Sequence, residues 1–322
     1  MKLSLEQLCE KLDLSFTGNG KLIIDHVCGH NYINSHGIAY CMRKKDMGTI
    51  DMPNDAAIVV PTGTIAEGKN LVYSEYPLET HVEITRLFYQ SPYASGAVHP
   101  AAVLAQDVIL GRNVTIDANV TIYNNVNIGD NTIIRAGTVI MDGSVIGKDC
   151  IIDPNVTICE RSNIGNRVII NGGAVIGAAD LGFYQKDGIH IRIPQVGQVI
   201  LEDDVEVGPG TVINRGRLEN TIVRKGCKLD AHVLISHNVD LGEHSMIIGQ
   251  SAIAGSTKTG HHFTAAGQSG VVGHLRIGNN VTLGARGVIT KDTPDNVALA
   301  GFPAVPHIRW KRNLIILNRI DS

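Results

Sequence analysis

Residues 110–140 read LGRNVTIDANVTIYNNVNIGDNTIIRAGTVI, and this stretch decides the fold. From Leu110 to Ile176 an aliphatic residue returns at every sixth position without exception. A helix repeats near 3.6 residues and a strand at two, so neither element alone produces a period of six. Six residues do fit one short strand and one turn, with the aliphatic side chain pointing inward from a flat face. The period therefore predicts a prism of stacked coils.

Glycine adds a second period to the same stretch, because Gly111, Gly129, Gly147 and Gly165 are eighteen residues apart. Eighteen is three sixes, so three faces complete one coil and the same corner recurs in each coil. Glycine suits a turn that needs a positive φ, and we expect these four glycines to adopt one. The predicted fold class is mainly β: a left-handed parallel β-helix of hexapeptide repeats.

The six-residue register also predicts the domain organisation. It begins at Val98, fails over residues 178–198, slips by four residues through Arg215–Leu218, and persists to residue 292. We therefore predict a β-helix over 98–292, with about nine to ten coils stacked ~4.8 Å apart, as strands are in a ladder. Residues 178–198 would form an inserted loop over one face, and such loops are common sites of function. Residues 293–322 are predicted to be a rigid link followed by a short C-terminal helix from His307 to Ile320.

Residues 1–97 lack the period and are predicted to form a small α/β domain. Ser4 is a plausible helix cap with Gln7 three residues later, and a second helix is expected from Leu78 to Tyr89. The segment Ser91–Gly96 is a linker by composition. Short apolar runs bounded by Gly, Pro, Asn and Asp predict strands at 22–24, 57–60 and 70–73.

Composition bounds the class of protein. The chain has 322 residues and a net charge of −3 with both signs mixed, which gives no reason to expect a nucleic-acid partner. Its six cysteines show no C-x-x-C spacing and no secretory signal precedes them, so reduced thiols and a cytoplasmic location are expected. No run reaches the ~20 apolar residues of a membrane-spanning helix.

Two histidines of the later coils are the strongest candidates for chemistry. His237 and His274 are 37 residues apart, one more than two coils, so they project from nearly the same corner, ~10 Å apart along the axis. A histidine near its usual pKa can take a proton from an ammonium group and free the amine to attack. Asp230 precedes His237 and is expected to orient its ring. The amide of Gly255, one coil after His237, is expected to face a developing oxyanion.

A metal site is the competing interpretation, because hexapeptide-repeat carbonic anhydrases bind zinc through three histidines. Zinc needs three protein ligands that converge at ~2.1 Å. His232 and His274 occupy the same hexad position on different faces, so one chain cannot easily bring both to one ion. A zinc lyase would require ligands from two subunits, and no metal is predicted for the single chain.

Residues 228–239 read KLDAHVLISHNV. They match the motif K-[IL]-D-N-x-V-x-I-A-H-N-V of the UDP-3-O-acylglucosamine N-acyltransferases of lipid A synthesis, and the chain resembles this family over nearly its whole length. The hexad period alone is shared by many acyltransferases, so these further motifs are the more specific part. They follow at the family's spacing and comprise Val98–Pro100, Ile193–Gly197, Ile253–Ser256, Gly273–Leu275, Ile277–Gly278, Gly301–Ala304 and Pro306–His307.

The resemblance implies an activity and an assembly. The family moves an acyl group from a phosphopantetheine thioester, carried by acyl carrier protein or coenzyme A, to the amine of a UDP-linked glucosamine. It is a homotrimer with each active site between neighbouring prisms, and it binds no cofactor tightly. By position, His237 would be the catalytic base, His274 the second important histidine, and Gly255 the oxyanion donor. Phe183 and Asn238 are expected to contact substrate.

The chain departs from the family where substrate is recognised. The family's S-F-x-x-N-x-x-Y becomes AYCMRKKD at 39–46, so Tyr40 keeps the aromatic that stacks on the nucleotide base, while Arg43 and Asp46 replace the asparagine and the second aromatic. D-R-G-A-L becomes NRGRL at 214–218, and Ala231 replaces an asparagine. These changes suit a relative that acylates another nucleotide-linked amino sugar, such as a dTDP-linked sugar, with a short acyl group from coenzyme A. A non-catalytic hexapeptide-repeat binding protein is the alternative from another class.

Overall fold

The computed structural model describes residues 1–322 except 90–91, 93, 302–307, 309–310, 314 and 317–322. The chain divides into two compact units, Met1–Pro92 and Tyr93–Ser322. The boundary thus precedes the predicted one at 97, because the amides of Ser95 and Gly96 already donate to Thr115 Oγ1 in the second unit. No helix among the described residues is both long enough and apolar enough to cross a membrane.

The first unit is a small α/β domain, as predicted. Its sheet has five strands, of which the last four in the order are parallel and the first is antiparallel. Apolar clusters cover both faces of this sheet. The strands in sheet order are β2 (Ser15–Thr17), β7 (Asn70–Ser74), β6 (Ala57–Pro61), β5 (Gly37–Tyr40) and β4 (His26–Val27).

Two α-helices and a short strand pair complete the first unit. Helix α1 (Leu5–Lys11) begins with the predicted capping box, in which Ser4 and Gln7 satisfy each other's amides. Helix α2 (Pro77–Phe88) confirms the predicted second helix and buries Ile84. The remaining elements are β1 (Leu3–Ser4) paired with β3 (Ile23–Ile24), and the 3-10 helix η1 (Lys44–Thr49).

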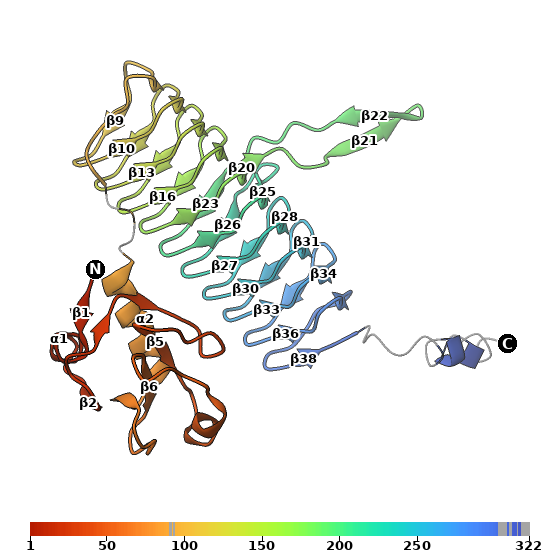
Figure 1. Ribbon diagram of the computed structural model, residues 1–322. Helices are drawn as coiled ribbons and strands as arrows, with labels where there is room; N and C mark the ends of the chain where they lie inside the picture. The colour runs from red at the N-terminus through yellow and green to blue at the C-terminus, as the bar shows by residue number, and fades with distance from the viewer. Residues whose placement is uncertain (90–91, 93, 302–307, 309–310, 314, 317–322) are drawn as a thin grey trace. The chain divides into compact units, whose positions relative to one another are not determined.

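The second unit confirms the predicted parallel β-helix (Figure 1). Its three faces are parallel sheets, which we number in the order the chain visits them. Face 1 holds β8 (Val103–Leu104), β11 (Thr121–Ile122), β14 (Val139–Ile140), β17 (Thr157–Ile158), β20 (Val175–Ala178), β25 (Val212–Asn214), β28 (Leu234–Ile235), β31 (Ala252–Ile253), β34 (Gly270–Val271) and β37 (Val288–Ile289). Face 2 holds β9 (Ile109–Leu110), β12 (Asn127–Ile128), β15 (Val145–Ile146), β18 (Asn163–Ile164), β23 (Val199–Leu201), β26 (Thr221–Val223), β29 (Asp240–Leu241), β32 (Lys258–Thr259) and β35 (Arg276–Ile277). Face 3 holds β10 (Thr115–Ile116), β13 (Ile133–Ile134), β16 (Ile151–Ile152), β19 (Ile169–Ile170), β24 (Glu206–Val207), β27 (Lys228–Leu229), β30 (Met246–Ile247), β33 (Thr264–Ala265), β36 (Thr282–Leu283) and β38 (Ala298–Leu299).

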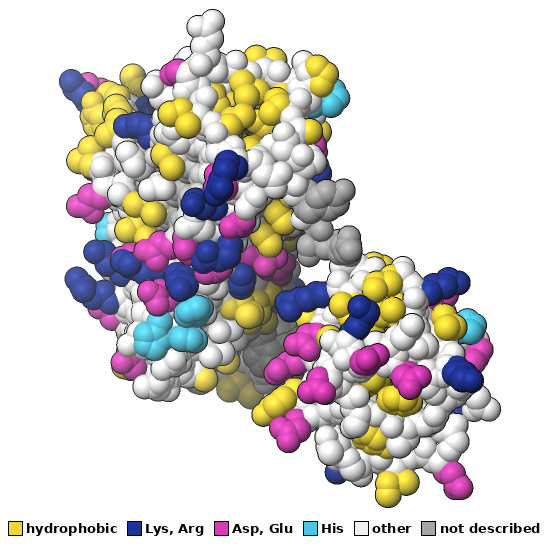
Figure 2. Space-filling model, turned by 90° about the vertical axis from the view of Figure 1, so that its left-hand side faces the viewer, with side chains coloured by type: hydrophobic (Ala, Val, Ile, Leu, Met, Phe, Trp, Pro, Cys, Tyr) yellow, Lys and Arg dark blue, Asp and Glu magenta, His cyan; other side chains and the backbone are white. Residues whose placement is uncertain are grey.

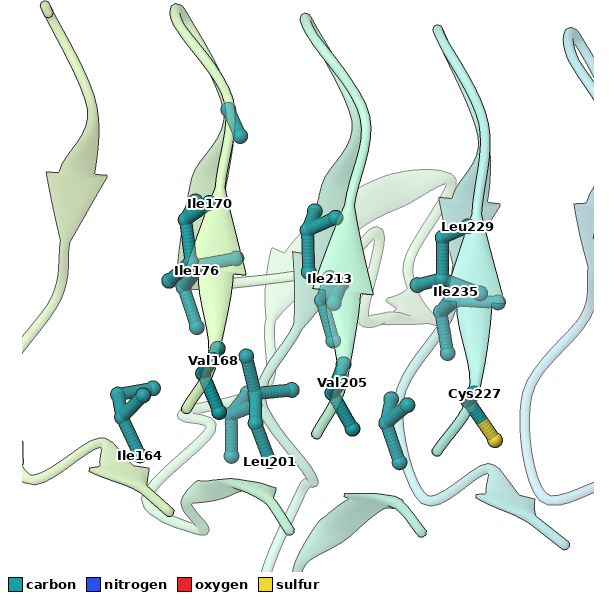
Figure 3. Packing of buried hydrophobic residues seen from close by; sticks show 14 of the residues in the cluster. Ile164, Val168, Ile170, Ile176, Leu201, Val205, Ile213, Cys227, Leu229 and Ile235 are labelled. Carbon is teal, nitrogen blue, oxygen red and sulfur yellow. The ribbon is translucent and has the colours of Figure 1, made fainter. Parts of the chain in front are cut away.

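The core of the second unit is the stack of inward residues that the period identified. Figure 3 shows one part of it, where Ile176, Ile213 and Ile235 of face 1 follow one another in successive coils. Corner residues such as Thr132 and Ser144 are also buried, and their hydroxyls donate to carbonyls of the next coil. The six-residue spacing therefore specifies both the apolar column and its satisfied polar corners.

The expectation that Gly111 and its counterparts have a positive φ is wrong. The positive φ falls two residues later, at Asn113 (58°) and Asn131 (58°), and asparagine tolerates this conformation. Gly111 serves close approach instead, since a Cβ there would lie 2.6 Å from the Asp130 amide of the next coil. The eighteen-residue glycine rhythm thus marks contact between coils.

Both breaks in the register occur where the chain passes from face 1 to face 2, which we call the 1–2 corner. Stacked residues normally lie 18 apart, but the spacing rises to 37 across residues 178–198 and to 22 in the next coil. Part of the inserted loop forms an antiparallel hairpin, β21 (Phe183–Lys186) with β22 (Ile189–Arg192), which extends from the solenoid in Figure 1.

The β-helix continues beyond the predicted end at residue 292. Thr293 forms a bridge with Ile277, and β38 pairs with β36 on face 3. The last coil is shortened, with stacked residues 16 apart, so the six-residue period no longer reveals it. The predicted helix from His307 to Ile320 lies largely outside the described residues.

Candidate functional site

The structure brings three of the predicted catalytic residues to the 1–2 corner. His237, Gly255 and His274 follow β28, β31 and β34 in consecutive coils. The His237 carbonyl accepts the Ser256 amide at 2.9 Å, and the Gly255 carbonyl accepts the His274 amide at 2.9 Å. His237 is partly buried, Gly255 is buried, and His274 is exposed. The corner thus presents one sheltered imidazole and one open imidazole.

Asp180, at the start of the inserted loop, holds the His237 ring. Its Oδ2 accepts both the His237 amide at 3.0 Å and the ring Nδ1 at 2.8 Å. Burial raises the pKa of Asp180, but the hydrogen bonds from His237 and the Leu181 amide together bring that pKa below its usual value. An ionised carboxylate only accepts, so Nδ1 carries a proton, and in the neutral ring Nε2 is the nitrogen with the free lone pair.

The prediction that Asp230 orients His237 is wrong. Asp230 lies at the turn after β27, where the chain passes from face 3 to face 1, and its carboxylate accepts the amides of Ala231 at 2.7 Å and Gly249 at 3.0 Å. These bonds close its own turn and tie it to the next coil. Asp180 takes the orienting position instead, although the residues are 57 apart in sequence.

Gly255 lies directly beneath the His237 ring. A Cβ at this position would be 2.6 Å from Nε2, so no side chain fits there. Among the described residues, no acceptor is bonded to the Gly255 amide. A buried amide without a protein acceptor, next to a basic nitrogen, suits an anion that forms during a reaction.

We expect Gly255→Ala to lower kcat by roughly 100-fold, because the added methyl group displaces the imidazole from the reacting atoms. Steady-state kinetics on the variant and on a Gly267→Ala control measure this. Gly267 occupies a turn elsewhere in the β-helix, where the nearest atoms to a Cβ are 3.6 Å away. Equal kinetics in the two variants would contradict the close packing of Gly255 on His237.

A buried arginine anchors the root of the inserted loop. The Arg215 side chain is 6% exposed; its Nε donates to the Gly177 carbonyl at 2.6 Å and its Nη1 to Glu160 Oε1 at 2.6 Å. The hydrogen bond from Arg215 lowers the pKa of Glu160, so this pair is ionised. Gln195 closes the loop by accepting the Asp180 amide at 2.7 Å through Oε1. Arg215 and Gln195 therefore support the residue that orients His237.

The two predicted substrate-contact residues of the second unit lie in different segments, Phe183 in the inserted hairpin and Asn238 in the turn after β28. Phe183 lines a cavity of about 440 Å³ with Leu181 and His190, on the hairpin. The Arg192 guanidinium lies 5.7 Å from the centre of the Phe183 ring. Asn238 is next to His237, and its Oδ1 accepts the Arg217 amide at 3.0 Å. Asn238 thus holds the four extra residues, Arg215–Leu218, at the 1–2 corner.

The first unit has its own cavity, of about 810 Å³, at the carboxyl ends of β4 and β5. Ligands of parallel α/β sheets bind at this edge. Tyr40 and Arg43 both line the cavity, as does Asp46, which accepts a bond from Arg43 Nε at 2.7 Å. The Tyr40 ring lies 4.9 Å from the His81 ring. The predicted nucleotide-contact residues therefore share one hollow.

His81 should make the first unit sensitive to acid. Burial lowers the pKa of His81, and its Nε2 donates to the Ile38 carbonyl at 3.2 Å. A base whose pKa is lower in the folded state contributes stability above its unfolded pKa, and this is lost as pH falls through the folded pKa. We expect the melting temperature of the wild type to fall between pH 7 and pH 5 more than that of His81→Gln. His26 acts in the opposite sense, because hydrogen bonds to Asp25 and Asn34 raise its pKa. The same dependence of melting temperature on pH in the wild type and in His81→Gln would contradict the prediction.

The other histidines of the later coils lie away from the 1–2 corner. His244, His261 and His262 are at the corner between faces 2 and 3, where the His261 and His262 Nδ1 atoms are 2.8 Å apart. Figure 2 shows histidines gathered on the solenoid beside a band of mixed charges. His232 is at the corner between faces 3 and 1, remote in the coil from His274. Within the described parts of the chain, no group of three His, Cys, Asp or Glu side chains is placed to hold a metal ion.

Residues 107–142 and 143–178 match the family model described as bacterial transferase hexapeptide (six repeats). A UDP-3-O-acylglucosamine N-acyltransferase of Geobacter sp. (strain M21) is 42% identical, over 100% of this chain and 93% of that protein. Its counterpart in Anaeromyxobacter dehalogenans is 32% identical over 99% of this chain and 92% of that protein. The alignment with the enzyme of that name from Methylobacterium nodulans, also 42% identical, spans 46% of this chain and less than half of the relative, 42% of its length.

Among solved structures, the Arabidopsis UDP-N-acetylglucosamine acyltransferase superimposes with a TM-score of 0.58. The sequences are 20% identical, and the match covers 67% of this chain and 77% of that one. This similarity concerns the fold alone.

Proposed function

Because the chain belongs to the UDP-3-O-acylglucosamine N-acyltransferase family, we propose that it transfers an acyl group from a phosphopantetheine thioester to the amine of a UDP-linked glucosamine derivative. The observation that carries this proposal is the His237 imidazole, whose Nδ1 is held by Asp180 and whose Nε2 lies 2.6 Å from the position that a Cβ on Gly255 would occupy. This arrangement places a base beside a potential oxyanion donor.

The reaction follows from these positions. Nε2 of His237 removes a proton from the amino group as the nitrogen attacks the thioester carbonyl carbon. The carbonyl oxygen becomes an oxyanion, to which the Gly255 amide donates a hydrogen bond. The C–S bond then breaks, and the thiolate takes the proton from the imidazolium. Asp180 stabilises the imidazolium without accepting its proton, as a buried carboxylate does in a catalytic triad. His274, open to solvent one coil beyond Gly255, would contact the thioester side.

Two cavities suit the remaining parts of the substrates. Tyr40 offers a ring for the nucleotide base, and Arg43 lies beside it in the same hollow. The apolar lining of Leu181 and Phe183 on the hairpin suits an acyl chain. The thioester carrier is acyl carrier protein or coenzyme A, and both carriers and the sugar nucleotide belong to the cytoplasm, where we place the enzyme.

A homotrimer is part of the proposal. The outward positions of face 1 carry no charged residue in any of its ten strands, and Val103, Leu234 and Val288 are exposed there. An uncharged flat face suits burial against copies of the same chain around a closed symmetry axis. The 1–2 corner borders this face, so a neighbouring subunit would complete the site. Sedimentation equilibrium of the full chain should give three times the mass of one chain, and a monomer at micromolar concentration would contradict the assembly.

The activity is tested with purified protein, a UDP-3-O-acylglucosamine and either acyl-acyl carrier protein or acyl-coenzyme A. Mass spectrometry should detect a second acyl group on the sugar nitrogen. UDP-N-acetylglucosamine, whose nitrogen is already blocked, should give no product. Absence of N-acylation with every donor, from a folded trimer, would contradict the proposal and favour a non-catalytic binding protein.

The Arg43–Asp46 ion pair favours testing a second nucleotide. It occupies positions where the family motif has an asparagine and an aromatic, and both side chains line the Tyr40 cavity. The pair places a cation and an anion in the hollow where the motif has a neutral amide and a neutral phenol ring. The second candidate is therefore acyl transfer to a dTDP-linked amino sugar, and a higher kcat/KM for that acceptor than for the UDP-linked one would support it.

A further inference from the structure

A separate small pocket lies on the face 2 side of the 1–2 corner. Its volume is about 250 Å³, and it is adjacent to the site because Asn238 follows His237 and Ser256 follows Gly255 in the chain. Residues of three coils line it: Arg217, Leu218, Glu219, Asn238, Ser256 and Lys258. The reaction described above uses none of the charges in this pocket.

The pocket contains four side chains with free hydrogen-bond donors. Among the described residues, neither the Arg217 guanidinium nor the Lys258 ammonium is within ion-pair distance of a carboxylate. Neither the Ser256 hydroxyl nor the Asn238 side-chain amino group donates to a described residue. Some other cations of the solenoid are paired, as in Arg167–Asp204 and Arg224–Asp240, both at 2.7 Å.

We propose that this pocket binds a phosphate group of one of the two substrates. Two cations and one carboxylate, Glu219, leave one net positive charge, and the amide and hydroxyl add neutral donors. A guanidinium recognises phosphate through two parallel hydrogen bonds, while an ammonium acts as a point charge. The inference rests on the proposed function for the identity of the substrates, which both contain phosphate.

The local fold explains how Arg217 reaches this position. Arg217 belongs to the four-residue slip that lengthens the coil before His237, and its amide is fixed by Asn238 Oδ1. Lys258 lies in β32, two coils beyond Arg217. The family motif has alanine at position 217, so Arg217→Ala should fold. Arg217 gives this pocket one more positive charge than it would have with the alanine of the family motif.

Two phosphates are chemically equivalent occupants: the diphosphate of the sugar nucleotide, or a phosphate of coenzyme A. Direct binding is measured first, as the thermal shift produced by inorganic pyrophosphate. We expect a shift in the wild type and in Lys225→Ala, whose lysine lies at the corner between faces 2 and 3. Arg217→Ala and Lys258→Met should each lose most of this shift. Equal shifts in all four proteins would overturn the proposal.

Kinetics then identify the source of the phosphate. Each pocket variant should raise one KM about tenfold or more, because a charged hydrogen bond to phosphate is lost. A rise confined to the acceptor assigns the sugar-nucleotide diphosphate, and a rise confined to acyl-coenzyme A assigns the donor. Unchanged KM values for both substrates, relative to Lys225→Ala, would overturn the assignment to a substrate.

The two proposals fail in different ways. The pyrophosphate shift does not require turnover, so its loss in Arg217→Ala would uphold the pocket even in a protein without acyl transfer. Conversely, a chain that N-acylates its acceptor but gives identical pyrophosphate shifts and KM values in every variant would retain the function and lose the pocket.

Discussion

Replacement of His237 by alanine is expected to lower kcat by about three orders of magnitude, with a much smaller change in KM. General-base catalysis contributes roughly 10²–10⁴-fold, and the three atoms nearest to a Cβ placed on Gly255 all belong to the His237 ring. The measurement is steady-state N-acylation by the variant. His232→Ala is the matched control, since His232 is an exposed turn residue of the same coil at another corner.

Asp180→Asn tests the contribution of the carboxylate that orients the His237 ring. Asparagine can keep a hydrogen bond to Nδ1 but no longer dictates which ring nitrogen carries the proton, so kcat should fall by about 10²-fold. The double variant His237→Ala/Asp180→Asn should be no slower than His237→Ala alone, because residues that act as a unit are not additive. A His237→Ala protein with kcat within tenfold of the wild type would contradict the assignment of the base.

Replacement of Arg215 by methionine is expected to give the largest loss of stability. The change leaves the Gly177 carbonyl without its side-chain donor and Glu160 without a partner. Removing one partner of a fully buried ion pair costs about 3–5 kcal/mol, but the Glu160 side chain is 43% exposed and can regain water. We therefore expect a loss of about 2–3 kcal/mol in the free energy of unfolding of the solenoid.

The matched control is Arg224→Met. Arg224 also forms an ion pair, with Asp240 at 2.7 Å, but its side chain is 39% exposed, so the cost should be below about 1 kcal/mol. Denaturant unfolding of both variants gives the comparison. Arg215→Met should also lose activity at temperatures where it remains folded, because the loop that carries Asp180 has lost its anchor. Equal destabilisation by the two changes would show that the buried pair has no special role.

The β-helix was predictable because each coil repeats the same local sequence pattern. An aliphatic residue at every sixth position has the same inward direction wherever it stands, so no long-range information is needed to place Ile116 or Ile235. The same arithmetic brought His237, Gly255 and His274 to one corner. The first unit was less accessible: β5, which carries Tyr40, was not predicted, since its sequence Gly-Ile-Ala-Tyr lacks a clear strand pattern.

Asp180 was missed for a physical reason. It lies inside an insertion, where the period that fixes direction has ended, and its contact with His237 depends on how the loop folds back. A usable signal was present, however. The insertion begins two residues after the inward Ile176, and the slip begins two residues after the inward Ile213. His237 likewise lies two residues after the inward Ile235 of the same face. The position within the coil therefore predicts that the first residues of the loop lie at the same corner as His237.

The glycine error has a similar origin. Glycine is required both by positive φ and by close contact, and a spacing alone does not distinguish the two. The structure assigns Gly111 to contact and Asn113 to the turn, because asparagine can adopt that backbone conformation while glycine alone permits the neighbouring coil to approach.

The uneven coil lengths at the 1–2 corner imply a form of modularity. One coil takes 37 residues and the next 22, yet on both sides the strands of face 1 resume their pairing with the same inward residues. Chain can thus be added or removed at this corner without moving the faces that hold the stack together. The paired strands of the three faces stabilise the fold, whereas the candidate catalytic residues lie at the 1–2 corner. Such a protein can therefore change its substrate by altering the length of a turn as well as by point substitution.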